Sequence, residues 1–485
     1  MLPWKNPKVL SIRITIIIIM IRKFVNRRRE LEALERAYRR GDRLFVVYGR
    51  RRVGKTTLLR KFLEGKRGIY FLCSQRGYEK DIERFSKEIG RLFNLPLRFD
   101  DFEDAFEFLS KQGKLVVILD EFPYLIEAYK PAVSVFQRIV DLTLENSEVM
   151  LVLSGSSVGM MEREVLSYKA PLYGRAGGIM KVRPFGFFDM VEWYGNDFEK
   201  LVRIYGVTWG VPRYMELIRD GSDEEIINNF FEPTAFLFNE ARVLLMEELR
   251  SPTTYGQIIE AIALGRTRLK EIADYAMIEP KDLPAYLRVL SNLGIVRREV
   301  PVTKKRAKRG IYTIEDEYFR FYYRFVSPHY EEIESLNPEP AIEDFRKNFN
   351  TYLGRTFEKI AKEFLIMMGG VGEVPHYNRF GRWWHKGEEI DLVALNERER
   401  KALFVEVKWK ELKEREARGI LKDLKRKAEL VGLDGWEKSY GLVAKVVEHK
   451  EELREEGWFV WDLMDFETVA GGFRVPSSGL PRAQG

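Results

Sequence analysis

The alternation of apolar runs and helical segments in the first 160 residues predicts a sheet covered by helices. Segments with helical periodicity cover roughly 79–94, 101–111 and 131–145. Between and around them lie apolar runs of the buried-strand type: RLFVVYG (43–49), GIYFLC (68–73), KLVVILDE (114–121) and EVMLVLSGSS (148–157). Strands that alternate with helices favour a parallel sheet wound on both faces. Residues 184–240 contain no comparable run and are interpreted as helices.

The pattern changes twice in the second half of the chain. Residues 241–330 predict helix, turn, helix and strand, followed by a short basic hairpin. The polar segment 331–344 contains two prolines and is interpreted as a linker. After it, a helix (352–365), two apolar strands joined by a polar turn, a lysine-rich helix (411–430) and a further strand predict a separate α/β domain.

Composition limits the class of protein. The 485 residues are 45% hydrophobic and 13% aromatic, which indicates several folded domains. The net charge of +7 permits contact with nucleic acid without requiring it. Charged residues make up 32%, as is typical of hyperthermophilic proteins. The single cysteine, Cys73, excludes a disulfide framework and a cysteine-based zinc site, so a cytoplasmic location is expected.

An apolar run, Val9–Ile21, stands near the N-terminus with Arg13 inside it. It is shorter than the roughly 20 residues that a membrane helix needs. No small-residue cleavage site follows it, so a signal peptide is not expected either. We interpret residues 1–19 as translated upstream sequence with Met20 as the natural start. An extra strand or a disordered tail is the alternative.

A phosphate-binding loop follows the first strand. GRRRVGKTT fits the pattern G-x-x-x-x-G-K-[ST] between a strand and a helix. Its glycines let backbone N–H groups approach phosphate oxygens at a helix N-terminus. Lys55 is expected to reach the β- and γ-phosphates and Thr56 to hold Mg²⁺, so ATP and Mg²⁺ are the predicted cofactors. The predicted nucleotide-binding residues are Gly49, Arg50, Arg51, Arg52, Val53, Gly54, Lys55, Thr56 and Thr57.

Two acidic residues end the third strand. Asp120 emerges at the carboxyl end, where α/β sheets bind their ligands, and is predicted to bind the Mg²⁺ of ATP. Glu121 follows it directly and is predicted to orient or deprotonate the attacking water. This pair favours ATP hydrolysis over passive binding. A surface carboxylate is the alternative for Glu121.

At this point the chain resembles a known group. FVNRRRELEALE, the phosphate loop, ILDEFPYL, LSGSSVGMME, PLYGRA and WGVPRYME together resemble the archaeal ATPase family of the AAA+/STAND P-loop proteins. The resemblance implies that Asn26 and Arg27 lie near adenine, that Ser156 senses the γ-phosphate, that Arg175 stabilises the transition state, and that Pro212 packs near the base. Bland alternatives are a helix N-cap, a turn residue, a surface ion pair and a helix-start proline.

The segment 241–330 predicts a winged helix. Its second helix, 282–294, is the expected recognition helix and offers Arg288 to a DNA groove. The hairpin that follows would contact phosphates through Lys304, Lys305, Arg306, Lys308 and Arg309. DNA is therefore a predicted partner. The alternatives are that these cations are simply solvated, or that the winged helix packs against other domains.

Charge inside the last two strands predicts a second site. In VEVKW, Glu406 and Lys408 are two residues apart and share a strand face. A turn at 396–401 can place that strand beside Asp391 in EIDLVAL. Two carboxylates would then converge on one Mg²⁺, and Lys408 would orient water or stabilise a phosphate.

The spacing of these residues resembles the PD-(D/E)xK restriction-endonuclease-like superfamily, and the C-terminal region resembles the DUF234 domain that follows archaeal ATPase modules. The resemblance adds Glu358, on the preceding helix, as a further acidic site residue. Ile390 replaces the usual proline before Asp391. The aromatic pair Trp383 and Trp384 could stack on bases, although core packing is the commoner role.

We therefore expect a multidomain α/β protein in which a P-loop ATPase with a helical lid acts on DNA through a winged helix and a Mg²⁺-dependent nuclease-like domain. The alternatives are a nucleotide switch whose C-terminal domain binds without cleaving, and a DNA-binding regulator with residual ATPase activity. Assembly of several copies is left open. The expected divisions are 1–21 (N-terminal extension), 22–183 (ATPase core), 184–240 (lid), 241–330 (winged helix), 331–344 (linker), 345–470 (nuclease-like domain) and 471–485 (disordered tail).

Overall fold

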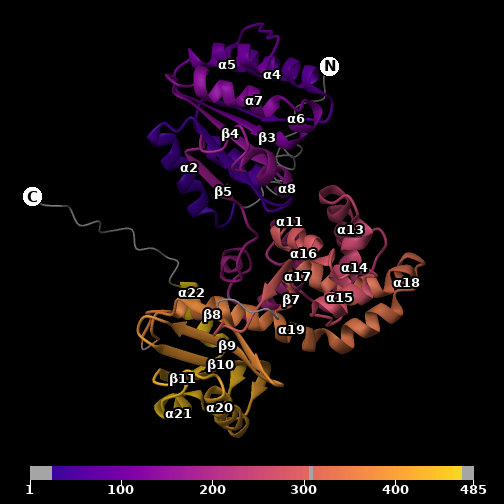
Figure 1. Cartoon of the computed structure of the whole chain (residues 1–485), viewed down its shortest axis with the longest axis vertical. Helices are drawn as coiled ribbons and strands as arrows, with labels where there is room; N and C mark the ends of the chain where they lie inside the picture. The colour runs from indigo at the N-terminus through magenta and orange to yellow at the C-terminus, as the bar shows by residue number, and fades with distance from the viewer. Residues whose placement is uncertain (1–23, 305–309, 373, 472–485) are drawn as a thin grey trace, which may run out of the picture. The chain divides into compact units, whose positions relative to one another are not determined.

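The computed structural model describes residues 24–304, 310–372 and 374–471 (Figure 1). The described residues divide into two compact units. The first lies within Met1–Tyr48, Gly54–Gly155 and Glu164–Val182, and the second comprises Gly49–Val53, Ser156–Arg163 and residues from Arg183 onward. The predicted N-terminal extension with Met20, the predicted tail beyond residue 471, and Lys305, Arg306, Lys308 and Arg309 lie outside the described residues.

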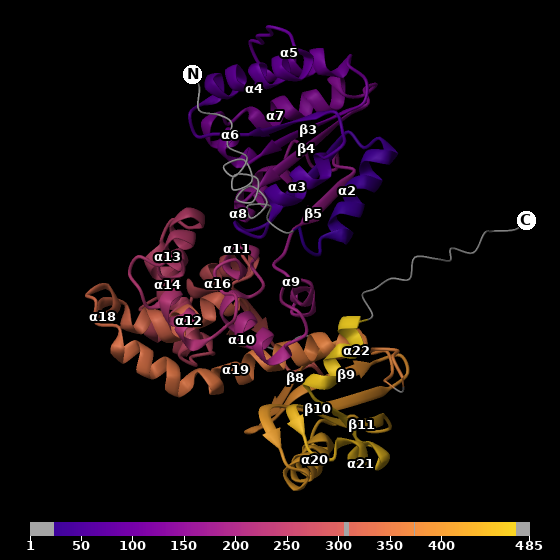
Figure 2. The same ribbon diagram turned by 180° about the vertical axis from the view of Figure 1, so that it is seen from behind.

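The first unit is built on a five-stranded parallel sheet in the order β2-β3-β4-β1-β5 (Figures 1 and 2). The strands are β1 (Leu44–Tyr48), β2 (Gly68–Leu72), β3 (Leu115–Asp120), β4 (Val149–Gly155) and β5 (Gly178–Lys181). Every residue of β3 and β4 is buried, as expected for central strands of a sheet covered on both faces. The predicted parallel α/β core is confirmed. The short edge strand β5 was not predicted, because its four residues are half-buried or exposed and carry no apolar run.

Helices cover both faces of this sheet. They are α2 (Arg28–Arg40), α3 (Lys55–Leu63), α4 (Tyr78–Phe93), α5 (Phe102–Ser110), α6 (Phe122–Ala128) and α7 (Ala132–Arg138), with a π-helical turn, η1 (Ile139–Thr143). Helix α2 contacts α3, whereas α4, α5, α6 and α7 form a separate group on the other face (Figure 1). Helix α2 ends at Gly41 in the left-handed conformation that glycine adopts without strain.

The second unit begins with short turns and a helical region. Its elements are α8 (Val158–Met160), the first three residues of η2 (Met161–Val165), η3 (Phe188–Met190), α9 (Val191–Tyr194), α10 (Phe198–Thr208), α11 (Pro212–Met215), α12 (Asp223–Phe230) and α13 (Phe236–Glu248). Residues 184–240 contain helices and no strand, as their sequence pattern predicts.

A helix–hairpin segment, residues 241–330, follows. It contains α14 (Pro252–Ala263), α15 (Leu269–Tyr275), α16 (Leu283–Asn292), β6 (Val296–Glu299), β7 (Ile311–Ile314), α17 (Glu317–Phe321), η4 (Tyr322–Val326) and η5 (Ser327–His329). Strands β6 and β7 pair antiparallel. The order of elements is the one that the sequence predicts for a winged helix.

The predicted linker at 331–344 needs correction. Helix α18 (Tyr330–Glu334) occupies its start, and the 30-residue helix α19 (Glu339–Met368) begins within it. The reason is that Pro340 stands in the first turn of α19, where proline is favoured rather than disruptive. One continuous helix, α19, therefore begins nine residues after the helix–hairpin segment and runs into the C-terminal domain.

The C-terminal domain is a second five-stranded sheet, in the order β12-β11-β10-β9-β8. Its elements are β8 (Arg379–His385), β9 (Glu388–Asn396), β10 (Lys401–Leu412), α20 (Glu414–Glu429), β11 (Glu437–Val447), α21 (Lys450–Glu455), β12 (Phe459–Trp461), η6 (Leu463–Asp465) and α22 (Phe466–Gly471). Strand β9 is antiparallel to β8 and β10, whereas β11 is parallel to β10 and β12. Helix α19 packs on β9 and β10, and α20 packs on β9, β10 and β11 (Figure 2).

One apolar core runs through the second unit. It joins Phe187 near the start of the unit, Phe321 of α17, Phe364 of α19 and Val405 of β10, all fully buried or nearly so. This continuity explains why the second unit is not divided at the predicted domain boundaries. Within the described residues, no helix has the length and hydropathy that a membrane span requires.

Candidate functional sites

The phosphate loop leads from β1 into α3. Gly54 has φ of +89°, a left-handed conformation that favours glycine, and α3 starts directly after it at Lys55. The Lys55 side chain is buried, and the Thr56 Oγ1 donates a hydrogen bond of 2.7 Å to Asp120 Oδ2. A helix N-terminus, a buried ammonium group and a hydroxyl tied to a carboxylate are the parts that bind the phosphates and the metal of a nucleotide.

Asp120 ends β3 and is held from two sides. Its Oδ2 also accepts a 2.5 Å hydrogen bond from the Tyr70 hydroxyl on the neighbouring strand β2, and Arg60 lies over the Tyr70 ring at 4.8 Å. Burial, reinforced by the charge of Asp120, raises the pKa of Tyr70 well above its ordinary value, so Tyr70 remains a donor. Tyr70 was not predicted from the sequence, because its relation to Asp120 depends on strand pairing.

Glu121 has φ of +55°, a left-handed conformation in a residue other than glycine. Such backbone strain is concentrated at functional sites. The conformation ends β3 and starts α6, and the Glu121 N–H donates to Asp120 Oδ1 at 3.1 Å. Asp120 and Glu121 therefore stand together at the carboxyl end of the sheet, as predicted.

The arginines of the phosphate loop have carboxylate partners in the second unit, to which Gly49–Val53 belongs. Arg50 pairs with the fully buried Asp316 and donates to the Tyr214 hydroxyl at 3.1 Å. Arg51 pairs with Glu247 at 2.7 Å, and Arg52 pairs with Glu240. Each guanidinium therefore engages a carboxylate, and the expected role of these three arginines in nucleotide binding stays a prediction.

The nucleotide-binding residues that the family resemblance implies lie at helix starts or just after a strand. Arg27, not Asn26, is the N-cap of α2, and Arg27 pairs with Glu30 at 2.9 Å. Ser156 is buried just after β4. Pro212 occupies the first turn of α11.

Arg175 belongs to the first unit, where its Nε donates to Asp141 at 2.8 Å and its Nη1 donates to the Pro171 carbonyl at 2.7 Å. This is the ion pair that was the alternative to a transition-state role.

A carboxylate–lysine cluster, Asp391, Glu406 and Lys408, lies in the C-terminal sheet. The antiparallel register of β9 and β10 runs to Val405 opposite Leu392, so Asp391 and Glu406 stand at the next position of the two strands. The Lys408 ammonium donates to Asp391 Oδ2 at 2.9 Å and to Glu406 Oε2 at 2.7 Å. Both carboxylates are buried, at 8% and 4% exposure. The structure thus brings together the three residues that the alternation of β9 and β10 predicts.

Charge coupling sets the protonation of this cluster. Burial by itself would raise the pKa of Asp391, but the Lys408 ammonium and the Val407 N–H lower it below its usual range. Burial and the Asp391 charge raise the pKa of Glu406. The two carboxylates raise the pKa of Lys408, which stays charged. Lys427 of α20 also donates to Glu406, at 3.2 Å, and was not predicted from the sequence.

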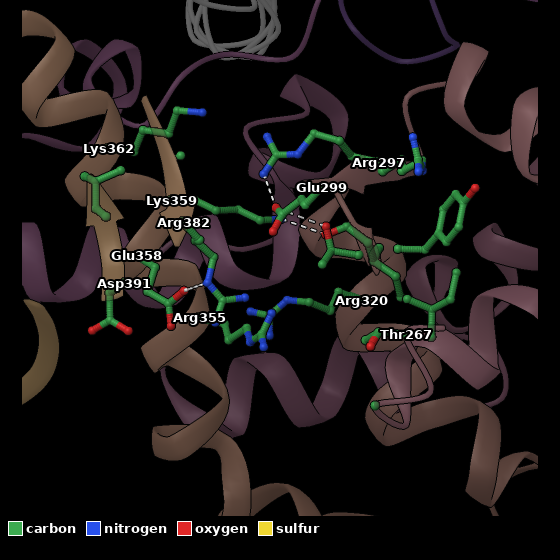
Figure 3. A pocket seen from close by; sticks show the side chains of 18 of the residues that line it. Thr267, Arg297, Glu299, Arg320, Arg355, Glu358, Lys359, Lys362, Arg382 and Asp391 are labelled. Atoms are coloured by element: carbon green, nitrogen blue, oxygen red, sulfur yellow. Dashed lines mark hydrogen bonds and ion pairs between the residues drawn. The ribbon is translucent and has the colours of Figure 1, made fainter. Parts of the chain in front are cut away.

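Glu358 of α19 lies near this cluster from the helix side (Figure 3). Burial, followed by the Asp391 charge, raises the pKa of Glu358 to about 7. The donor set is made of oxygen atoms, which suits a hard divalent cation such as Mg²⁺. Such a cation would also relieve the repulsion that raises the pKa of Glu406. The residues present therefore fit a Mg²⁺ ion.

The remaining predicted residues are mostly at the surface. Arg288 is exposed on α16, opposite the buried Leu283, Leu287 and Leu290, and Lys304 is exposed after β6. On β8, Trp383 is buried in the core, which favours packing over base stacking, while Trp384 is half-buried.

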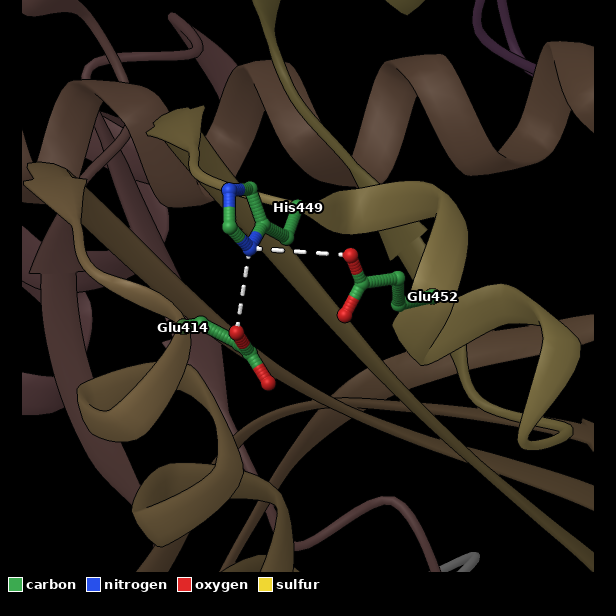
Figure 4. A group of neighbouring side chains, drawn as sticks. All are labelled: Glu414, His449 and Glu452. Atoms are coloured by element: carbon green, nitrogen blue, oxygen red, sulfur yellow. Dashed lines mark hydrogen bonds and ion pairs between the residues drawn. The ribbon is translucent and has the colours of Figure 1, made fainter.

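Among the described residues, Glu414, His449 and Glu452 also come within metal-ligand distance of one another (Figure 4). Glu414 Oε2 lies 3.1 Å from His449 Nδ1, and Glu414 Oε1 accepts from Arg418 at 2.7 Å. His449 and Glu452 are exposed. The geometry is that of a surface ion-pair network, in which Glu414 already has two partners.

Comparison with known proteins identifies two regions. Residues 24–218 match the family described as an ATPase domain predominantly from Archaea, and residues 322–420 match DUF234, described as archaeal and bacterial proteins of unknown function. The uncharacterized protein MJECL04 of Methanocaldococcus jannaschii is 41% identical over 451 residues, which are 91% of this chain and 100% of that protein.

Among solved structures, the Walker-type ATPase paby2304 of Pyrococcus abyssi is 24% identical, covers 62% of this chain and 97% of its own, and has a TM-score of 0.48. A STAND protein with a tetratricopeptide repeat sensor from Pyrococcus horikoshii, PH0952, is 18% identical over 71% of this chain and 49% of its own, with a TM-score of 0.30. The chain belongs to the archaeal ATPase family in which an ATPase domain is followed by a DUF234 domain.

Proposed function

We propose that this ATPase acts on DNA and that its C-terminal domain is a Mg²⁺-dependent phosphodiesterase whose activity ATP controls. The observation that carries the proposal is the carboxylate–lysine cluster. Its two adjacent carboxylates are buried, with an ammonium group within 2.9 Å of both. Burying such charges costs free energy even when they are paired, so we infer that the cluster serves a function other than packing.

In the ATPase domain, Lys55 would bind the terminal phosphates, and Thr56 and Asp120, which share a 2.7 Å hydrogen bond, would hold Mg²⁺. Tyr70 fixes the Asp120 carboxylate. Glu121 stands beside Asp120 and would orient or deprotonate the attacking water.

In the C-terminal domain, Asp391 and Glu406 would hold Mg²⁺. When bound, that ion would make a coordinated water more acidic and oppose the charge of the phosphate. Lys408 would place its positive charge against the pentavalent phosphate, in a low-dielectric setting where such charge is most effective. Lys427, bound to Glu406 Oε1, would keep that carboxylate in position.

A cleavage assay tests the proposal. The full chain would be incubated with Mg²⁺ or Mn²⁺ and linear, circular or branched DNA, with and without ATP. Asp391→Asn and Glu406→Gln should each abolish cleavage. Glu399→Gln, in the exposed turn between β9 and β10, is the matched control and should cleave as the parent does. Cleavage that survives both site substitutions, or no cleavage of any substrate, contradicts the nuclease function.

The ion pairs of the phosphate-loop arginines favour a second candidate function. Arg50 and Arg52 bind carboxylates that are 0% and 1% exposed, so a nucleotide on this loop would act directly on α13 and the start of α17. In a nucleotide switch of this kind the C-terminal domain would bind DNA or a protein without cutting. ATP-dependent binding with no cleavage under any condition would favour it.

A further inference from the structure

A basic cavity of about 550 Å³ lies between the helix–hairpin segment, α19 and the first strands of the C-terminal sheet (Figure 3). Nine arginine or lysine side chains and only three carboxylates line it. Neither the phosphate loop nor the carboxylate–lysine cluster accounts for this excess of positive charge.

Some of these cations are neutralised within the protein. Arg320 and Lys359 both pair with the fully buried Glu317, and Arg297 pairs with Glu299. In contrast, the described residues offer no hydrogen bond or ion pair to Arg355 or Lys362. Their charges act on Glu358 and Glu299 through space, but no direct carboxylate contact to either cation stands among the described residues.

A single face of α19 carries this charge. Arg355, Glu358, Lys359 and Lys362 all line the cavity and follow the spacing i, i+3, i+4, i+7, which places side chains on one side of a helix. Burial, followed by the charge of Arg297, lowers the pKa of Lys362. Cations are therefore crowded against one another here, an arrangement that an anion in the cavity would relieve.

The cavity leads to the carboxylate–lysine cluster. Thr351, Glu358 and Asp391 line both this cavity and the neighbouring one that contains Lys408. Arg382 stands at the junction, with Nη2 3.0 Å from Glu389 and its buried Nε 3.8 Å from Glu358 Oε2, an ion pair without a hydrogen bond among the described residues. A chain of phosphates in the basic cavity would therefore continue to Asp391.

We propose that the basic cavity binds a single phosphodiester strand, DNA or RNA, with Arg355, Lys362 and Arg382 on its phosphates, and delivers the next phosphate to the carboxylate–lysine cluster. This inference rests on the proposed function only for the fate of the delivered phosphate. The volume lies in the range of small-ligand pockets, roughly 300–1,000 Å³, which admits about one or two nucleotides and excludes a duplex. Tyr312 and Phe380 in the lining offer aromatic faces for bases.

The binding experiment uses the full chain in EDTA, so that no cleavage is required. Fluorescence anisotropy would compare a labelled 20-nucleotide DNA strand, the same RNA strand and a 20-base-pair duplex. The double variant Arg355→Gln/Lys362→Gln should weaken binding of single strands at least about tenfold. It should also reduce the slope of log K against log salt by about 1.4, for two phosphate contacts at roughly 0.7 each.

The matched control is Arg346→Gln/Lys347→Gln, which removes two exposed cations from the same helix outside the cavity. It should change affinity less than about twofold, because distant exposed charges are screened. The conservative variant Arg355→Lys/Lys362→Arg should restore most of the affinity, which separates lost charge from a damaged fold. Equal weakening by the control, or no weakening by the cavity variant, overturns the proposal.

A protection experiment locates the strand. The only natural cysteine, Cys73, is buried, so Thr351→Cys in the cavity wall and Arg346→Cys outside it would each provide one accessible thiol. A bound single strand should slow maleimide labelling of the first thiol and leave the second unchanged. Equal protection of the first thiol by the duplex would overturn the proposal. So would inorganic phosphate that binds as tightly as the single strand and displaces it, because the ligand would then be phosphate alone.

The two proposals fail in different ways. If the strand binds and protects Thr351→Cys but no substrate is cut, the nuclease function fails and the strand site stands. If Asp391→Asn abolishes cleavage while Arg355→Gln/Lys362→Gln changes neither binding nor cleavage, the nuclease function stands and the strand site fails.

Discussion

The phosphate loop of the first unit and the carboxylate–lysine cluster of the second place their charges at different points of a sheet. Lys55 is the first residue of α3, directly after the phosphate loop, and Asp120 is the last residue of β3. Asp391, Glu406 and Lys408 stand inside β9 and β10, where they neutralise one another. We expect the charges of the phosphate loop to act mainly on a bound ligand and those of the carboxylate–lysine cluster to act mainly on one another. Removing a lysine should therefore lower turnover at the first site and stability at the second.

The largest expected effect is on ATP turnover. Lys55→Ala should reduce turnover by at least about 10²-fold, because it removes a charge directed at the terminal phosphates. The melting temperature without nucleotide should change little. Phosphate release and thermal unfolding would be measured beside Lys61→Ala, an exposed lysine of the same helix. Turnover within a few-fold of the parent would contradict a role of Lys55 in binding the terminal phosphates.

The opposite result is expected in the C-terminal sheet. Lys408→Met should destabilise the second unit by about 3 kcal/mol, because it leaves two buried carboxylates without their shared cation. Adding Asp391→Asn should recover part of that loss. Denaturant unfolding would be compared with Lys410→Met, an exposed lysine on the same strand. Equal stability of the two methionine variants would refute mutual neutralisation.

A third buried charge gives a pH test. Glu363 of α19 accepts N–H bonds from Phe187 and Phe188, and burial raises its pKa to about 7 from 4.5. The folded chain then holds a proton that the unfolded chain releases, so stability should fall as pH rises from about 4.5 to about 7 and level off above that. The fall should be on the order of 2–3 kcal/mol.

Glu363→Gln should make this fall smaller by about 2–3 kcal/mol, because that side chain no longer titrates, whereas Glu358, whose pKa is also raised to about 7, still does. Glu343→Gln, at an exposed position of the same helix, should keep it. Unfolding free energies measured across that pH range would decide. A pH dependence that is identical in all three proteins would show that Glu363 titrates normally.

The smallest expected effect concerns Tyr70. Tyr70→Phe removes one hydrogen bond to Asp120, worth about 1 kcal/mol, and should lower ATP turnover by less than about tenfold. Tyr38→Phe, on α2, removes a hydroxyl remote from that bond and is the control. Steady-state turnover at saturating Mg²⁺ would be measured. A loss of turnover as large as that of Lys55→Ala would show that Tyr70 takes part in the reaction rather than only positioning Asp120.

Sequence reasoning worked best where chemistry is contiguous. Gly49–Thr57 and the Asp120–Glu121 pair are short motifs whose context, a strand and then a helix, can be recognised locally. The cluster at Asp391 could also be predicted, because alternation along two strands joined by one turn fixes their faces.

Features set by packing between distant segments could not be predicted. Tyr70 reaches Asp120 through the pairing of β2 with β3, and Lys427 reaches Glu406 through the docking of α20. Arg355 and Lys362 lie on one helical face, but only the fold shows that a cavity stands opposite. The linker at 331–344 was mispredicted because a proline in a polar segment can start a helix as well as break one.

Helix α19 has a mechanical consequence. Its 30 residues extend about 45 Å without a break, with one end against the helix–hairpin segment and the other against the C-terminal sheet. A helix of this length turns a small rotation at one end into a larger displacement at the other. Tilting it by about 5° about one end would move the other by about 4 Å, given its length. Glu358 stands about 28 Å along the helix from Glu339, so the same tilt would move it by about 2.5 Å. That is close to the hydrogen-bond lengths of 2.7 and 2.9 Å in the carboxylate–lysine cluster, so a small rotation near α17 would change the spacing of Glu358 and Asp391.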